Sequence, residues 1–260
     1  SEGINAQLSL PSKNIDKLKD LIDDIAFLNK VRLNIAVEHD DESFLKLKIK
    51  IRDKIVADGL KEFDYDLEKN GEHVNAEQFN SLLEDKNTIT VDMRNHYESE
   101  IGHFKGADLP DVDTFRESLP IINDKYKNQK TKKNILMYCT GGIRCEKASA
   151  YLIKNGYKNV YQLEGGIIEY ARQIKKYDIE NKFIGKNFVF DNRRAERISK
   201  QIISFCHQCD EKCDNHVNCN NEACHLLFLQ CEKCKIKFDG CCSFDCKEIY
   251  SLPIDDQRKL

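Results

Sequence analysis

The chain has 260 residues, of which 40% are hydrophobic and 33% charged, and its net charge is −3. This composition is typical of a folded globular protein and excludes a disordered chain, while the length predicts about two domains. No stretch approaches the roughly 18 apolar residues of a membrane span, and SEGINAQLSL at the start lacks the features of a signal peptide. We therefore expect a cytoplasmic protein that is not embedded in a membrane.

Residues 1–71 predict a small α+β domain. Apolar residues alternate in residues 4–10, 31–37 and 45–51, as they do in strands with one buried face. Ser12 can cap an amphipathic helix between the first two of these segments. An antiparallel sheet with a helix on it, of the ferredoxin or acylphosphatase type, is the fold that this pattern favours.

Residues 75–177 predict a parallel α/β sheet. Three short apolar runs have the length of buried strands: residues 88–92, 135–138 and 160–163. Helical patterns separate them, notably at residues 113–123 and 146–154, and Gly156 stops the second. Buried strands that alternate with helices are typical of a parallel sheet covered on both faces.

The loop at residues 138–149, YCTGGIRCEKAS, joins one of these strands to a helix. Backbone N–H groups and the start of a helix favour an anion at such a loop, so a cysteine there has a lowered pKa. Gly141 and Gly142 allow a tight turn, and Arg144 adds a cation. Cys139 is therefore the predicted nucleophile. Only four residues separate it from Arg144, one fewer than in the Cys-x5-Arg loop of cysteine phosphatases, which favours sulfur chemistry over phosphoryl chemistry.

Further residues are predicted to belong to this site. Cys145 lies in the first turn of the expected helix, where it either forms a disulfide with an oxidised Cys139 or packs beneath the loop as a small side chain. Asp92, Arg94 and Glu98 follow a strand, at the sheet edge where ligands bind. Asp92 either braces the site or takes part in the chemistry, and Arg94 is expected to be exposed and to contact an anionic substrate. The remaining loop residues are Thr140, Gly141, Gly142 and Ile143.

Residues 181–260 hold ten of the 12 cysteines. Cys206-x2-Cys209 and Cys231-x2-Cys234 have the form of zinc knuckles and predict one site of four thiolates. A second site can be drawn from six others: Cys213, Cys219, Cys224, Cys241, Cys242 and Cys246. Alternative ligands are His207, His216 and His225. An iron–sulfur cluster and disulfides are the alternatives to zinc, and with few large apolar residues this region is expected to need metal to fold.

Two basic stretches are candidates for RNA binding. In RRAERISK, at helical spacing, three of four basic residues share a face; the four are Arg193, Arg194, Arg197 and Lys200. In KLKIKIR, residues 46–52, basic side chains alternate along an expected strand. They either follow a phosphate backbone or protect an exposed strand edge from pairing.

Three stretches resemble a rhodanese domain: VDMRNHYESEIGHFKGA at residues 91–107, YCTGGIRCEKASAYL at 138–152 and VYQLEGGIIEY at 160–170. More narrowly, the chain resembles the bacterial rhodanese-containing tRNA uridine hydroxylases. This narrower resemblance rests on EGIN near the start, on the CTGGIRCEKA loop, and on FVFDNR before the cysteine-rich tail.

The resemblance implies a central rhodanese domain and oxygen-dependent hydroxylation of the wobble uridine, position 34, of tRNA to 5-hydroxyuridine. It implies tRNA as partner, molecular oxygen as co-substrate, and a persulfide on Cys139, the position that matches the family's active-site cysteine. Family members carry residues before EGIN, so this chain is expected to lack a first strand. Two other functions stay open: transfer of persulfide sulfur to tRNA or a small acceptor, and a non-catalytic adaptor that binds RNA or protein through the metal-binding tail.

Overall fold

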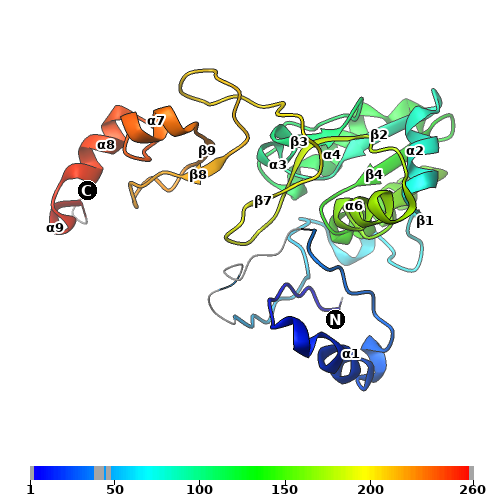
Figure 1. Ribbon diagram of the computed structural model, residues 1–260. Coiled ribbons are helices and arrows are strands. Elements are labelled where there is room, and N and C mark those ends of the chain that lie inside the picture. Colours follow the sequence, from blue (N-terminus) through cyan, green and yellow to red (C-terminus); the bar gives the residue numbers. More distant parts are fainter. Residues whose placement is uncertain (1–2, 38–43, 45–47, 258–260) are drawn as a thin grey trace.

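A computed structural model of the chain describes residues 3–37, 44 and 48–257. Figure 1 shows a short helical part near the N-terminus, a central sheet surrounded by helices, and an extended arm that leads to small helices at the C-terminus. Within the described residues, no helix has the length and apolar character that crossing a lipid bilayer requires.

The central sheet has four strands in the order β1-β5-β4-β2. These strands are β1 (Glu72–Val74), β2 (Thr88–Asp92), β4 (Asn134–Tyr138) and β5 (Asn159–Leu163). The three predicted strands are confirmed, and the three pairings are parallel, as predicted. Asp92 pairs with Tyr138 in the register, so β2 and β4 end side by side. The loops that follow these two strands therefore meet at one edge of the sheet.

Five helices accompany the sheet: α2 (Ala76–Glu84), α3 (His96–Glu100), α4 (Phe115–Lys125), α5 (Ile143–Lys154) and α6 (Gly166–Tyr177). The helices predicted at residues 113–123 and 146–154 are confirmed as α4 and α5, with shifted bounds. Helix α5 begins earlier than predicted because Gly142, at a φ of +99°, turns the chain directly into it. The first turn of α5 therefore carries both Arg144 and Cys145.

The strand β4 is buried on both faces of the sheet. Ile135 and Met137 pack into one core with residues of α4 and α5. Leu136 and Tyr138 pack into a second core with residues of α2 and α6. A strand covered on both sides is apolar at every position, which is why a continuous apolar run marked it in the sequence.

The N-terminal part contains helix α1 (Ile15–Asp23), as predicted, after a 3-10 turn at Ser12–Asn14; Asn14 rather than Ser12 occupies the capping position. Two further 3-10 turns lie at Ala26–Leu28 and Glu62–Asp64.

The strands predicted in this part do not form in the described residues, and residues 45–47 lie outside them. Alternation gives a strand only where a neighbouring strand takes its backbone hydrogen bonds. Here Ile49 and Ile51 stay 85% and 95% exposed. The strand prediction is therefore wrong for residues 4–10, 31–37 and 48–51.

A three-stranded antiparallel sheet connects the central domain to the C-terminal region. Its order is β3-β6-β7, formed by β3 (Gly102–Phe104), β6 (Phe183–Phe188) and β7 (Ala195–Arg197). The helical spacing considered for residues 193–200 does not apply, because Arg194 lies in a turn at a φ of +59° and β7 pairs with β6. The remaining elements are β8 (His216–Asn218), β9 (Leu227–Leu229), α7 (Glu232–Lys237), α8 (Phe244–Ser251) and α9 (Ile254–Gln257).

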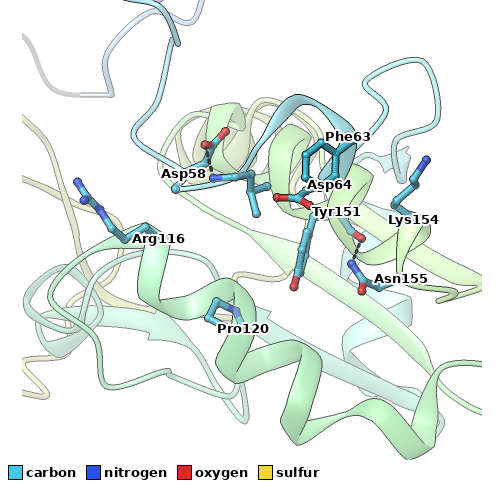
Figure 2. A pocket seen from close by; sticks show the side chains of 10 residues that line it. Asp58, Phe63, Asp64, Arg116, Pro120, Tyr151, Lys154 and Asn155 are labelled. Atoms are coloured by element: carbon cyan, nitrogen blue, oxygen red, sulfur yellow. Dashed lines mark hydrogen bonds between the residues drawn. The ribbon is translucent and has the colours of Figure 1, made fainter.

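A pocket of about 500 Å³ lies between residues 58–64 and helices α4 and α5. Figure 2 shows Arg116 and Pro120 of α4 facing the segment that carries Phe63, with Tyr151 of α5 between them. None of its lining residues belongs to the loop at residues 139–145. This pocket is therefore separate from the predicted nucleophile.

A buried ion pair fastens residues 54–65 to α5. The Lys147 Nζ lies 3.1 Å from the Asp58 carboxylate, with both side chains almost fully buried, and 4.0 Å from the centre of the Tyr65 ring. Asp58 also accepts hydrogen bonds from the Lys54 side chain at 2.7 Å and the Leu60 backbone at 2.9 Å. Burial raises the pKa of Asp58, but these partners outweigh burial and lower the pKa below its usual value.

We expect Asp58→Asn to lower the free energy of unfolding by ~3 kcal/mol at pH 7, because it leaves the Lys147 ammonium buried without a counter-charge. Because the folded-state pKa of Asp58 is lowered, its stabilisation is present above the unfolded pKa of about 4 and is lost as the pH falls through the folded pKa. Denaturant unfolding at pH 7 and at about pH 3 measures both effects. The exposed Asp111→Asn is the matched control, and equal stabilities of the two variants at pH 7 contradict the prediction.

Candidate active site and cysteine clusters

The Cys139 thiol lies where β4 ends and the loop to α5 begins. Its Sγ accepts a hydrogen bond from the Gly142 backbone at 3.1 Å, and the residue is only 1% exposed. The hydrogen bond from the Cys145 thiol lowers the pKa of Cys139 most, burial opposes it, and the Arg144 charge and the loop N–H groups lower it further, to about 6. At neutral pH this sulfur is therefore largely a thiolate, the form that acts as a nucleophile.

Cys145 is a free thiol in the first turn of α5 and is fully buried. Burial raises its pKa well above the usual value, and the Cys139 thiolate raises it further. Cys145 therefore stays protonated, and its S–H group donates a hydrogen bond to the Cys139 sulfur. The structure brings the two cysteines together as predicted, in a packed arrangement beneath the loop, and a disulfide between them stays a prediction.

Arg144 is held by a buried carboxylate. Its two terminal nitrogens bind the Glu98 oxygens at 2.5 and 2.8 Å, and Glu98 of α3 is fully buried. The Thr140 hydroxyl also donates to Glu98, at 3.4 Å. The sequence placed Glu98 at this edge of the sheet but gave it no specific role or partner. The available signal was the Asn95-x-x-Glu98 capping box at the start of α3, which fixes where this carboxylate points.

Asp92 and Arg94 form a fully buried ion pair beneath the site. The Arg94 guanidinium binds the Asp92 carboxylate at 2.6 Å and the Gly102 carbonyl oxygen at 2.5 Å. The expectation of an exposed Arg94 is wrong, because its side chain is fully buried. The pair connects the end of β2 to β3, so its position favours a bracing role for both residues over contact with substrate.

The start of α6 closes against the loop. The Ile167 N–H donates to the Cys139 carbonyl at 3.0 Å, and the Ile168 N–H donates to the Thr140 carbonyl at 3.2 Å. A side chain at Gly166 would lie 2.5 Å from the Cys139 carbonyl oxygen. Only glycine permits this approach. Residues 164–166 (EGG) were not predicted as part of the site, but they pack against the loop and constrain its conformation.

The basic residues predicted for RNA binding do not form one free basic face. Arg193 binds Asp191 and Glu196, at 2.5 and 2.6 Å. Arg194 donates to the His216 carbonyl, and Arg197 binds Asp214 at 2.5 Å. Lys200 is exposed and has no ion-pair partner among the described residues. Lys48, Lys50 and Arg52 of the other basic stretch are exposed, and Lys46 lies outside the described part.

Eight of the ten cysteines of this region form two groups of four: Cys206, Cys209, Cys231 and Cys234, and then Cys219, Cys224, Cys242 and Cys246. Within each group all four sulfur atoms lie within 4.8 Å of one another. The first group is the predicted one. The second uses four of the six remaining candidates, and Cys213 and Cys241 lie in neither group. Among the described residues no histidine belongs to either group, so His207, His216 and His225 are not ligands of these two groups.

The geometry of both groups suits a tetrahedral metal ion. Metal–sulfur bonds of about 2.3 Å place neighbouring sulfurs about 3.8 Å apart. The Cys209 and Cys231 sulfurs are 3.6 Å apart, and those of Cys224 and Cys242 are 3.7 Å apart. Backbone N–H groups also point at the sulfurs, as from Cys231 to Cys206 at 3.4 Å, which stabilises thiolates. Both groups can therefore hold a metal ion.

Comparison with known proteins identifies the domains and the family. The Rhodanese-like domain matches residues 75–173, the Rhodanase C-terminal domain matches 184–247, and the UPF0176 acylphosphatase like domain matches 1–55. A protein of Photorhabdus laumondii subsp. laumondii named tRNA uridine(34) hydroxylase is 54% identical, over 99% of this chain and 73% of its own length. Proteins of the same name from Leptospira interrogans and Yersinia pestis are also 54% identical, with 70% and 72% of their lengths covered. The chain belongs to the tRNA uridine(34) hydroxylase family.

Family membership confirms the predicted order of an acylphosphatase-like part, a rhodanese domain and a cysteine-rich region. In this member of the tRNA uridine(34) hydroxylase family, the described residues within 1–55 contain α1 but no paired strand. The Rhodanase C-terminal match spans all eight cysteines of the two groups.

We expect Cys145→Ala to raise the pKa of Cys139 from about 6, because it removes the hydrogen bond that lowers this pKa most. Cys145→Ser keeps an O–H donor and is expected to shift it less. The rate of Cys139 alkylation against pH, resolved by mass spectrometry of the Cys139 peptide, reports the pKa. An unchanged profile in Cys145→Ala contradicts the role assigned to Cys145.

We expect the purified protein to bind two metal ions per chain, one for each group of four cysteines. Cys206→Ser is expected to remove one ion and to lower the stability of the tail, because three thiolates hold the metal less tightly than four. Cys213→Ser, outside both groups, is the matched control. Elemental analysis per chain measures the result, and equal metal content in the two variants contradicts the assignment.

Proposed function

We propose that this protein hydroxylates the wobble uridine, position 34, of tRNA to 5-hydroxyuridine, with tRNA as substrate and molecular oxygen as co-substrate. The observation that carries the proposal is the Cys139 thiolate in its anion-binding loop, in a chain 54% identical to proteins named tRNA uridine(34) hydroxylase. The similarity extends over 99% or more of the chain, so the region that is compared includes the loop and the elements that hold it.

In this proposal Cys139 carries the reactive sulfur as a persulfide, which forms when the thiolate attacks the outer sulfur of a persulfide or thiosulfate donor and the donor's thiolate or sulfite leaves. Its lowered pKa supplies a nucleophilic thiolate at neutral pH. The Gly142 N–H and the start of α5 stabilise negative charge at the loop. Arg144, held by its ion pair with Glu98, contributes positive charge beside the sulfur. Cys145 keeps the sulfur in its ionised form by donating a hydrogen bond. Asp92 and Arg94 hold the end of β2 in place below the loop.

Sulfur transfer is a second candidate, because the same features favour a persulfide on Cys139. A thiolate with a pKa of about 6 attacks a sulfur donor readily. The persulfide would then pass its outer sulfur to tRNA or a small acceptor. The two functions share the loop and differ in the product, so product analysis separates them.

We propose that the two cysteine groups hold zinc and that their role is structural. Zinc favours four thiolates in a tetrahedron, and a site closed by four protein ligands has no open position for a substrate. Thiolate groups of this kind persist in a reducing compartment, which supports a cytoplasmic location. Elemental analysis that finds iron with visible absorbance instead of zinc would overturn the choice of metal.

The deciding test is the content of 5-hydroxyuridine and its derivatives in tRNA. A bacterial strain that lacks its own enzyme is complemented with the wild-type chain, with Cys139→Ser, or with Cys213→Ser. We expect wild type and Cys213→Ser to restore the modified nucleosides, and Cys139→Ser to leave them at background, because a hydroxyl is not a comparable nucleophile. Full restoration by Cys139→Ser contradicts the proposal.

The sulfurtransferase alternative has its own readout. If the wild-type chain forms thiocyanate from thiosulfate and cyanide, restores no modified nucleoside, and loses the former activity in Cys139→Ser, then sulfur transfer replaces hydroxylation as the function.

A further inference from the structure

Residues 31–37 of the N-terminal part lie beside the Cys139 loop, although they are more than 100 positions away in the sequence. Arg32 Nη1 binds Glu164, the first residue after β5, at 3.0 Å. The Val37 N–H donates to the Glu196 carboxylate of β7 at 3.0 Å. This segment is therefore attached at both ends to the rhodanese domain and its C-terminal extension.

Two side chains of this segment contact the glycines that form the loop. A Cβ built on Gly165 would lie 3.3 Å from the Arg32 Cζ, and one built on Gly142 would lie 4.0 Å from the Arg32 Nη2. A Cβ on Gly141 would lie 4.0 Å from the Asn34 Nδ2. The contact at Gly165 is tight, so the missing side chain there favours the close approach of Arg32, whereas the two distances of 4.0 Å are ordinary van der Waals contacts with the backbone around Cys139.

Both side chains keep polar atoms available. Arg32 is 41% exposed and uses only Nη1 in its ion pair, which leaves Nη2, on the side of Gly142, without an acceptor among the described residues. Asn34 is exposed, and its amide has no hydrogen-bond partner in the described part of the chain. Arg144, by contrast, is 11% exposed and gives both terminal nitrogens to Glu98.

We propose that Arg32 and Asn34 are substrate-binding residues, which the N-terminal part supplies to the Cys139 site. Arg32 binds a phosphate beside the target uridine, and Asn34 forms hydrogen bonds with the edge of the base. This inference rests on the proposed function and names residues that hold its substrate.

The burial of Cys139 supports this assignment. Because the residue is only 1% exposed, a base must leave its stack to approach the sulfur, as bases do in enzymes that modify them. A guanidinium suits the phosphate of such an extruded nucleotide. The amide of Asn34 offers a donor group and an acceptor group side by side, which match the alternating N–H and C=O groups of uracil.

Binding of a labelled anticodon stem–loop to the full chain tests the proposal. Arg32→Gln is expected to raise the dissociation constant about 10-fold, as loss of a charged hydrogen bond does, and to reduce the slope of log K against log salt by about 1. Asn34→Ala is expected to raise it about 5-fold, as loss of a neutral hydrogen bond does, without changing the salt slope, because the amide is uncharged.

Two further variants separate binding from a structural role. Lys30→Gln removes the same charge two residues earlier and is expected to leave the affinity within about 2-fold of wild type, since one exposed charge away from the phosphate adds little. Glu164→Gln frees Arg32 from its ion pair and is expected to leave binding equal to wild type or tighter. If Glu164→Gln weakens binding as much as Arg32→Gln does, Arg32 only anchors the segment and the proposal is wrong.

The same variants in the complemented strain distinguish this inference from the proposed function. Wild-type levels of 5-hydroxyuridine and wild-type affinity in Arg32→Gln and Asn34→Ala overturn the inference alone. Failure of the wild-type chain to restore the nucleoside, or restoration by Cys139→Ser, overturns the proposed function. Reduced nucleoside together with weaker, less salt-dependent binding in Arg32→Gln supports both.

Discussion

The ion pair between Arg144 and Glu98 is the interaction on which the site depends. It joins the first turn of α5 to α3 through a carboxylate that no solvent reaches. Removing either partner would leave a charge buried alone, which is strongly unfavourable, so the pair fixes the loop as well as its charge. With Arg144 held in this way, Cys139 lies beside a stationary cation and beneath backbone N–H groups. The hydrogen bond from Cys145 lowers the pKa of Cys139 most, burial opposes it, and the Arg144 charge and these N–H groups lower it further.

The central sheet makes the ion pair possible. Because β2 and β4 are adjacent and parallel, the segments that follow them emerge at the same edge. One of them leads to α3 and Glu98, and the other contains Cys139 and Arg144. The Asp92–Arg94 pair holds the first segment, and the start of α6 supports the second. Three separate parts of the chain thus converge on one sulfur atom.

The C-terminal region depends on sulfur in a different way. Two of its small cores consist mainly of cysteines with one or two aromatic or aliphatic side chains, so there is little apolar area to stabilise a fold. Metal ions bound by the two groups of four would replace that missing core. The β3-β6 pairing and the His207–Glu100 contact at 2.6 Å connect this region to the catalytic domain. Loss of metal would therefore also disturb the structure around α3 and Glu98.

Local pattern in the sequence was sufficient to predict three of the four strands of the central sheet, helices α4 and α5, the loop that carries Cys139 and Arg144, and the first group of four cysteines. Those features depend on short-range chemistry: apolar runs, glycines in a turn, and CxxC spacing. The tertiary structure alone decided the burial of Arg94, the partners of Arg193 and Arg197, the membership of the second cysteine group, and the approach of Arg32 and Asn34 to the loop. Each of these depends on which distant residues meet, and neither residue type nor spacing specifies that. The N-terminal segments illustrate the same limit, because alternation predicts a strand only when the fold provides a neighbour to pair with it.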